Sequence, residues 1–166
     1  MKPMTGLFIV SLGLSGCTGQ PDNYNFVMSS DTDEQDIAAA VLASNEWNEC
    51  GIGVLTSVSV GDSVSKDQIS IWMTQTMPPA GNPKALGDTT YWNNNNADLV
   101  SIRIGMGSVQ TRQVMAHEFG HVMGLGHRPE GLMRAEYNSE HFHVTETECQ
   151  ALQRCRQDPS LNECLH

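Results

Sequence analysis

The segment HEFGHVMGLGH, residues 117–127, constrains the fold of this chain more than any other stretch. His117 and His121 are four residues apart, so on an α-helix their side chains project side by side from one face. On a continuous helix the ring of His127 would point well away from both. Gly124 resolves this conflict, because a glycine can adopt a left-handed conformation that ends a helix and reverses the chain. The segment therefore predicts a helix, then a turn that returns His127 to the other two histidines.

Three histidines that meet at one point have the chemistry of a zinc site. Imidazole nitrogens bind Zn²⁺ at about 2.0 to 2.1 Å, and a catalytic zinc ion commonly has three protein ligands. Glu118 follows the first histidine and is rotated from it by about 100°, so it can reach a water activated by the metal without binding the metal itself. The pattern predicts hydrolysis, with Glu118 as the general base. The alternative is an amphipathic helix whose histidines only complete hydrogen bonds.

The segment matches the H-E-x-x-H-x-x-G-x-x-H signature and thereby resembles the metzincin metallopeptidases. The GLM sequence at residues 131–133 resembles the methionine-containing turn of that clan, with Met133 beneath the metal. The G-L-G-H ending and the expected order of elements are most similar to the matrixin branch. This resemblance implies an α/β (α+β) catalytic domain: a mixed twisted sheet, a long N-terminal helix, an active-site helix and a C-terminal helix.

The resemblance also implies a function, which is zinc-dependent hydrolysis of peptide bonds in proteins or peptides. It implies one catalytic Zn²⁺ bound by His117, His121 and His127, with Glu118 as general base and then proton donor. Gly124 and Met133 would have structural roles. The alternatives are a zinc-binding envelope lipoprotein without productive catalysis and a purely structural envelope protein.

Some features depart from the matrixin pattern. Only five residues separate His127 from Met133, which predicts a smaller turn and specificity pocket. Ala135 occupies the position where some metzincins have a tyrosine. His141 and His143 alternate in EHFH, but we expect a solvated strand or loop there, since no helical spacing or nearby cysteine supports a second site. Matrixins often hold structural calcium, but no Asp-rich loop in this sequence resembles a calcium site, so the resemblance is not taken to imply bound calcium here.

Local patterns predict the remaining elements. TDEQ at residues 32–35 is a capping-box sequence, and the helix it opens would bury Ile37, Ala40, Val41 and Trp47 and end near Cys50. TETE at residues 145–148 is a second capping box. Strands are expected at residues 24–30, 54–60, 68–76, 85–92 and 97–105, a polar loop at 93–96, and helices at about 32–50, 108–124 and 145–157.

The N-terminus has the features of an export signal. Lys2 precedes an apolar run, which is far shorter than the roughly 20 residues of a membrane-spanning helix. The ending LSGC resembles the bacterial lipobox, in which the signal is cut before the cysteine and that cysteine is lipidated. We therefore expect a signal peptide at 1–16, a lipid on Cys17, a tether at 17–23 and one metallopeptidase domain at 24–166. The alternative is an ordinary cleaved signal with an incidental cysteine.

An exported chain with an even number of remaining cysteines favours disulfides. On one helix, Cys149 and Cys155 would be six residues and about 9 Å apart along the axis, too far to be joined. Two connectivities remain, and both link Cys50 or Cys164 to that helix. Free buried thiols are the alternative.

The charge of the chain restricts its partners. The formal net charge is −10, and removal of Lys2 with the signal makes the mature chain more acidic still. We therefore do not expect the chain to bind nucleic acid, whose backbone is also negatively charged. We expect a monomer in the bacterial cell envelope, on its periplasmic or cell-surface side, anchored to the membrane through Cys17.

Overall fold

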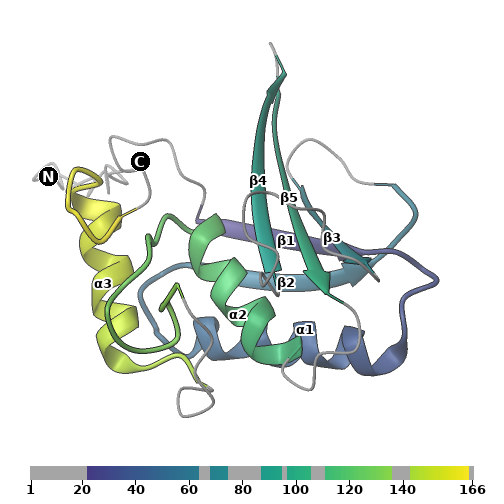
Figure 1. The fold of residues 1–166 in the computed structure, drawn as a ribbon, viewed down its shortest axis with the longest axis horizontal. Coiled ribbons are helices and arrows are strands. Elements are labelled where there is room, and N and C mark those ends of the chain that lie inside the picture. Colours follow the sequence, from purple (N-terminus) through teal and green to yellow (C-terminus); the bar gives the residue numbers. More distant parts are fainter. Residues whose placement is uncertain are drawn as a thin grey trace, which may run out of the picture.

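A computed structural model describes residues 22–63, 68–74, 87–94, 97–105, 111–135 and 143–164. Within these ranges, one strand and a long helix are followed by four strands and then by two helices (Figure 1). The elements in chain order are β1 (Asn23–Met28), α1 (Glu34–Asn48), β2 (Leu55–Val60), β3 (Gln68–Thr74), β4 (Gly87–Asn94), β5 (Ala97–Gly105), α2 (Thr111–Val122) and α3 (Glu146–Gln157).

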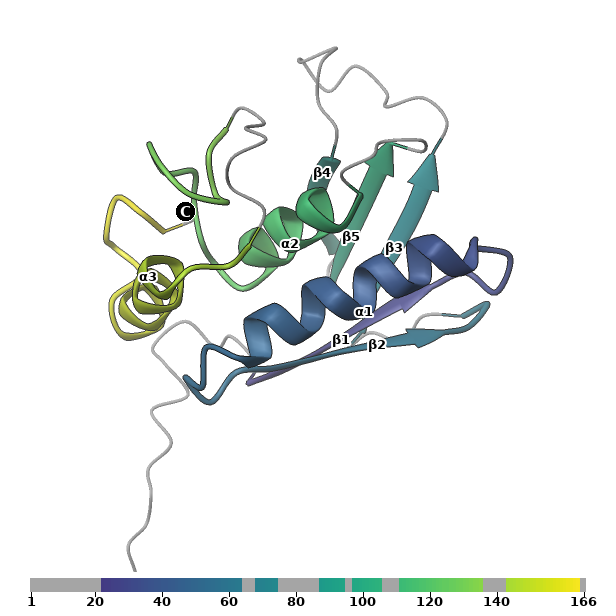
Figure 2. The same ribbon diagram turned by 90° about the horizontal axis from the view of Figure 1, so that it is seen from below.

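The strands form one mixed sheet in the order β2-β1-β3-β5-β4. The β1 strand pairs in parallel with β2 and β3, and β3 pairs in parallel with β5. The β4 strand is antiparallel to β5 and forms one edge of the described sheet. Both α1 and α2 lie on the same side of the sheet, and α3 lies beyond the end of α2 (Figure 2). The predicted α/β (α+β) class, with a mixed sheet and three helices, is confirmed.

The first helix begins and ends at local signals. Its N-cap is Asp33, whose side chain accepts a hydrogen bond from the Gln35 N–H. This corrects the prediction that the capping box begins at Thr32, because the carboxylate of Asp33 accepts the hydrogen bond from the otherwise unpaired N–H of the first turn. The helix ends at Asn48, and Gly51 and Gly53 follow with φ of 64° and 79°.

The face that α1 buries differs in one residue from the predicted face. Ala40 and Trp47 are buried and Ile37 packs against the core, as expected. Val41, however, is 39% exposed, which corrects its assignment to the core face. The packing of α1 on the sheet and on α2 decides which residues point inward, and Ala43 and Ser44 are buried instead.

Aromatic side chains join α2 to both of its neighbours. The rings of Phe26 in β1 and Phe119 in α2 are stacked, with centroids 3.8 Å apart. The indole N–H of Trp47 in α1 donates to the Ala116 carbonyl at 2.9 Å. All four residues are buried, so α2 is fixed between the sheet and α1.

One disulfide attaches α3 to the end of α1, and a second attaches it to the C-terminal segment. Cys50, just after α1, pairs with Cys149, and Cys155 pairs with Cys164, with Cα–Cα distances of 5.3 and 5.4 Å. This is one of the two predicted connectivities, and the prediction that Cys149 and Cys155 are not joined is confirmed. The capping box at Thr145 and Glu148 is also present.

Other boundaries shift slightly. The β1 strand begins at Asn23, one residue before the expected start, and β4 continues through Asn93 and Asn94, which were predicted as loop. The expected helical residues 108–110 and the proposed signal, lipobox and Cys17 lie outside the described residues. Among the helices described, none has the length and apolar character needed to cross a membrane.

Candidate metal centre

The α2 helix presents two histidines to the same point. His117 and His121 are one turn apart, and their ring centroids are 4.6 Å apart. His121 is buried, whereas His117 is partly exposed. Both rings therefore project from one face of the C-terminal half of α2, at the boundary between the core and the surface.

A helix-terminating turn follows at Gly124. Its φ is 102°, in the left-handed region, and α2 ends at Val122. The Leu125 N–H donates to the Gly120 carbonyl and the Gly124 N–H to the His121 carbonyl, both at 2.9 Å. This pair of bonds is the Schellman arrangement, which requires a left-handed residue at the position of Gly124.

The reversed chain places His127 opposite the two helical histidines. Its ring centroid lies 5.4 Å from that of His117 and 4.8 Å from that of His121. One nitrogen from each ring can be chosen so that all three lie within 4.8 Å of one another. Small side-chain shifts would bring them to the separations of a tetrahedral zinc site, so the three residues could hold one metal ion.

Backbone carbonyls set the tautomers of the two helical histidines. His117 Nδ1 lies 2.8 Å from the Leu132 carbonyl oxygen, and His121 Nδ1 lies 2.7 Å from the Leu125 carbonyl oxygen. A carbonyl only accepts, so in both rings Nδ1 carries the hydrogen and Nε2 keeps its lone pair in the neutral state. That lone pair is what a metal requires, and the donor set therefore fits zinc.

Burial favours the neutral form of all three rings. It lowers the pKa of His117, although the bond to the Leu132 carbonyl opposes the shift. Partial desolvation of its ring also lowers the pKa of His127, although the residue is largely exposed. For His121, burial and the neighbouring His117 together lower the pKa to about 4. At neutral pH the site therefore offers lone pairs rather than positive charges.

Glu118, the residue after His117, has a buried side chain. Glu118 is only 5% exposed. The hydroxyl of Thr89, from the edge strand β4, donates to Glu118 Oε2 at 2.5 Å. The carboxylate is therefore oriented by a residue of another element, in the manner of a general base held in one position.

Met133 packs against α2 at Gly120. Its side chain is fully buried, and its sulfur atom occupies the space where a Cβ on Gly120 would stand. The short segment from His127 returns through a hydrogen bond from the Arg128 N–H to the Met133 carbonyl at 2.8 Å. The five-residue spacing is therefore long enough to close a turn.

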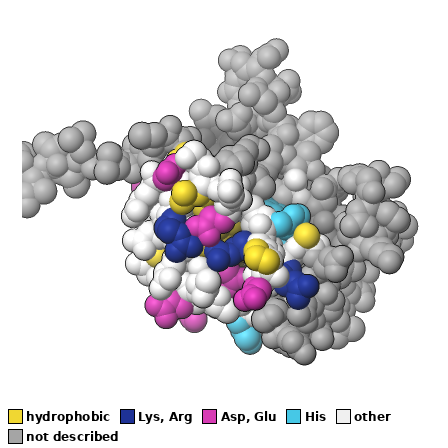
Figure 3. Space-filling model, turned by 60° about the vertical axis from the view of Figure 1, so that its left-hand side comes forward, with side chains coloured by type: hydrophobic (Ala, Val, Ile, Leu, Met, Phe, Trp, Pro, Cys, Tyr) yellow, Lys and Arg dark blue, Asp and Glu magenta, His cyan; other side chains and the backbone are white. Residues whose placement is uncertain are grey.

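The surface next to the candidate centre carries charges of both signs. His127 is exposed on this surface. Nearby along the chain, Arg128 forms an ion pair with Glu163 at 3.1 Å, and Glu163 forms a second ion pair with Arg154 at 2.7 Å. Figure 3 shows acidic and basic side chains interspersed on this face, with histidine at its border. The described residues on this face form no continuous basic patch.

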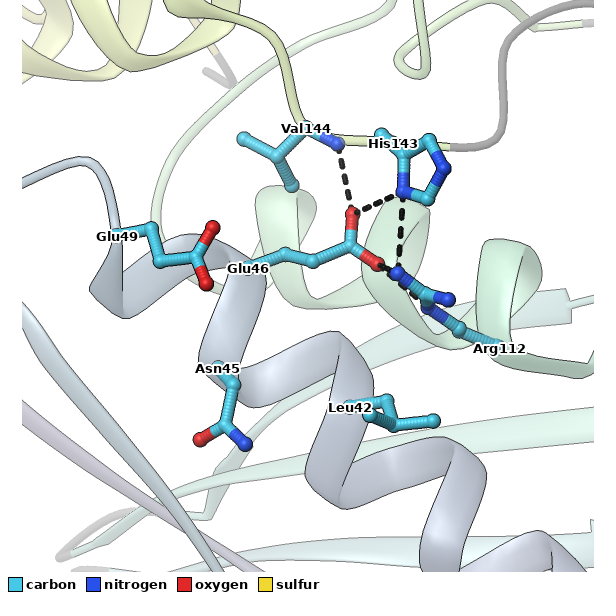
Figure 4. Close-up of a pocket in the computed structure, with 7 residues that line it drawn as sticks. All are labelled: Leu42, Asn45, Glu46, Glu49, Arg112, His143 and Val144. Atoms are coloured by element: carbon cyan, nitrogen blue, oxygen red, sulfur yellow. Dashed lines mark hydrogen bonds and ion pairs between the residues drawn. The ribbon is translucent and has the colours of Figure 1, made fainter.

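His143 belongs to a different contact. The side chain of His143 is 65% exposed and lies 3.5 Å from Glu46 of α1. The Glu46 carboxylate also accepts hydrogen bonds from the Val144 N–H at 2.9 Å and from the Nε–H of Arg112 at 2.5 Å (Figure 4). His143 Nδ1 also lies 3.0 Å from the guanidinium of Arg112, so the partners of this histidine are a carboxylate and a guanidinium. His141, its proposed companion, lies outside the described residues, as does Tyr137.

Sequence reasoning missed several residues of the centre. Thr89 is distant in sequence, and no local pattern indicates it. The Leu125 and Leu132 carbonyls contribute backbone atoms, which sequence patterns do not reveal. Gly120 did have a signal, since a glycine inside a helix reduces stability and usually has a packing reason.

Comparison with known proteins adds to this geometry. The family model described as Matrixin matches residues 28–155, which include most of the sheet, the three histidines and most of α3. A search of curated proteins found no significant match.

Proposed function

Because this chain belongs to the matrixin family of metallopeptidases, we propose that it is a zinc-dependent endopeptidase. In this proposal His117, His121 and His127 bind one zinc ion and Glu118 is the general base. One observation above all supports it: nitrogens of the three rings lie within 4.8 Å of one another, and the residue after His117 has a buried carboxylate that Thr89 holds in place. Gly124 provides the turn that makes this convergence sterically possible, and Met133 packs beneath it.

Each residue then has a defined task. Bound zinc would polarise the scissile carbonyl and lower the pKa of water toward neutrality. Glu118 accepts the proton of the attacking water and passes it to the leaving amine. Thr89 keeps one carboxylate oxygen of Glu118 in a fixed position throughout. The Leu132 and Leu125 carbonyls hold Nδ1 of each helical ring, which would leave Nε2 to bind the ion.

The substrate would bind along the edge of the sheet. The β4 strand lies at the edge of the described sheet, and α2 packs against it. An extended peptide that pairs with a free strand edge gains backbone hydrogen bonds irrespective of its sequence. Because Thr89 of β4 contacts Glu118, a peptide on this edge would pass directly by the general base. Proteins or peptides with an accessible extended segment are therefore the proposed substrates.

The direct experiment is digestion of a peptide library by the zinc-loaded protein. We expect cleavage that a zinc chelator abolishes and that added zinc restores. A protein that binds one zinc ion yet cleaves no member of the library would show a zinc-binding protein without catalysis, and the proposal would be wrong. A protein that binds no zinc would favour a structural role instead.

We also propose that Cys17 anchors the protein to a membrane of the bacterial envelope. The support is the sequence LSGC after a short apolar run. A labelled fatty acid should be incorporated at Cys17, and Cys17→Ser should move the protein to the soluble fraction. Unchanged membrane fractionation of the variant would contradict the anchor and leave the peptidase proposal intact.

A further inference from the structure

One peptide group connects His117 to a buried carboxylate. The carbonyl of Leu132 accepts the hydrogen bond from His117 Nδ1 at 2.8 Å. The N–H of the same peptide group belongs to Met133, and it donates to Glu148 Oε1 at 3.1 Å. A continuous chain of two hydrogen bonds therefore runs from the candidate zinc ligand through the backbone to Glu148.

The Glu148 carboxylate is built into this position. Glu148 is 1% exposed, and its second oxygen accepts both the N–H and the hydroxyl of Thr145 at 2.8 Å. The turn makes room for it at Gly131, which has a φ of 84° and where a Cβ would lie 2.5 Å from Glu148 Oε1. The next residue, Cys149, is joined to Cys50. The start of α3 and the turn before Met133 are therefore fixed against each other.

His121 provides an internal comparison. Its Nδ1 donates to the Leu125 carbonyl, and the N–H of the same peptide group, that of Gly126, donates to the backbone carbonyl of Glu163 at 2.9 Å. Each helical histidine thus has a peptide group behind it. The difference is the last acceptor, which is a neutral amide carbonyl behind His121 and a side-chain carboxylate behind His117.

We propose that Glu148 is a positioning residue of the metal centre, which acts on His117 through the peptide group between Leu132 and Met133. Hydrogen bonds in a chain polarise one another, so a carboxylate on the N–H makes the carbonyl a stronger acceptor. A stronger acceptor at Nδ1–H orients the ring and raises the basicity of Nε2 toward a metal. Glu148 therefore strengthens the hold of His117 on zinc without touching either. This inference rests on the proposed function in that the three histidines hold zinc.

Zinc affinity distinguishes this role from simple capping of α3. The test titrates Zn²⁺ against a chromophoric chelator for the wild type, Glu148→Gln and the control Thr145→Ala. The control loses the hydroxyl bond at the same helix start but keeps the bond between Met133 and Glu148. We expect the zinc dissociation constant of Glu148→Gln to rise about 10-fold, the lower end of outer-shell effects, and that of Thr145→Ala to change less than about twofold. Equal constants for the two variants would overturn the proposal.

A proton NMR measurement on the metal-free protein tests independently whether Glu148 acts on His117. The Nδ1–H proton resonance of His117 should move upfield in Glu148→Gln, because its hydrogen bond weakens, whereas that of His121 should stay in place. Equal shifts of the two resonances, or none, would show that Glu148 has only a structural role.

A second variant covers the case in which Glu148→Gln does not fold. Glu148→Asp keeps a carboxylate near Thr145 but is one methylene shorter, so its bond to Met133 should be lost. It should weaken zinc binding in the same direction, and unchanged affinity would again overturn the proposal. The peptidase proposal is tested separately, since a wild type that binds zinc but cleaves nothing refutes that proposal while the affinity comparison still decides the role of Glu148.

Discussion

The side chain of Met133 packs against Gly120, the residue of α2 just before His121. A Cβ on Gly120 would overlap the Met133 sulfur and lie 3.0 Å from the indole of Trp47. The helix and the turn beneath it can therefore approach this closely only because Gly120 has no side chain. Met133 sets the position of the histidine-bearing face from below.

Gly120→Ala should destabilise the protein. Overpacking of a filled core costs about 1 to 3 kcal/mol, which the better helix propensity of alanine, about 1 kcal/mol, offsets only in part. Denaturant unfolding measures the change, with Gly61→Ala as control because a Cβ there meets nothing closer than 3.9 Å. Equal stability of the two variants would contradict the packing described for Met133.

Gly124→Ala should weaken zinc binding as well as stability. A left-handed alanine costs roughly 1 to 2 kcal/mol, and relief of that strain would move His127. Gly51→Ala is a matched control, since Gly51 also has a positive φ of 64° but has nothing within 4 Å of its Cβ position. Both variants should lose stability, and only Gly124→Ala should lose zinc affinity in a chelator competition. Equal zinc affinities would mean that the turn does not position His127.

Zinc and activity should be lost together on acidification. Bound histidines must be neutral, and protons compete with the metal as the pH falls below neutrality. His127→Ala should shift the loss to higher pH, because two ligands compete less well, whereas His143→Ala and His141→Ala should not. Zinc content measured against pH for these variants decides the assignment. If either control is as sensitive as His127→Ala, the third ligand is misassigned.

The metal-free protein should show its own pH dependence. The folded-state pKa of His121 lies below its unfolded value, at about 4. Below about pH 6.5 the unfolded chain thus binds more protons than the folded one, so stability is complete above that pH and falls as the pH drops toward 4. Denaturant unfolding in chelator should show this slope, and His121→Ala should reduce it. A slope unchanged in the variant would argue against the buried, neutral ring.

The two disulfides should differ in their contribution to stability. Cys50–Cys149 spans 99 residues and Cys155–Cys164 spans 9. Loop-closure entropy gives about 4 to 5 kcal/mol for the long loop and about 2 to 3 kcal/mol for the short one. Paired alanine variants compared by urea unfolding measure both values. A larger loss from the short loop would indicate that the C-terminal segment stabilises the domain through contacts rather than chain entropy.

Local signals predicted a large part of the fold. The last strand was predicted with the observed bounds, Ala97–Gly105, because its alternation is strong and a glycine ends it. The turn at Gly124 followed from the spacing of the histidines and the presence of a glycine between them. The rotation of α1 did not, since the exposure of Val41 depends on how the helix packs on the sheet, which is a tertiary property.

The partners of the site residues were harder to predict. Thr89 reaches Glu118 from a strand 29 residues earlier, and no local pattern encodes that contact. Glu148 was recognised as part of a capping box, but its bond to the Met133 N–H depends on how α3 meets the turn. Sequence patterns thus predicted candidate ligands and a candidate base, while the groups that orient them became visible only in the structure.

The central claim is that Glu118 is a general base beside three zinc ligands rather than a ligand itself. Glu118→Gln, compared with the wild type and with Glu46→Gln, tests it most directly, since Glu46 is another largely buried carboxylate that holds Arg112 outside the candidate centre. Zinc content and the kcat/KM for a cleaved peptide should be measured on the same samples. We expect all three proteins to bind one zinc ion and only Glu118→Gln to lose about 10²- to 10⁴-fold in kcat/KM. Near wild-type turnover by zinc-loaded Glu118→Gln would contradict the account.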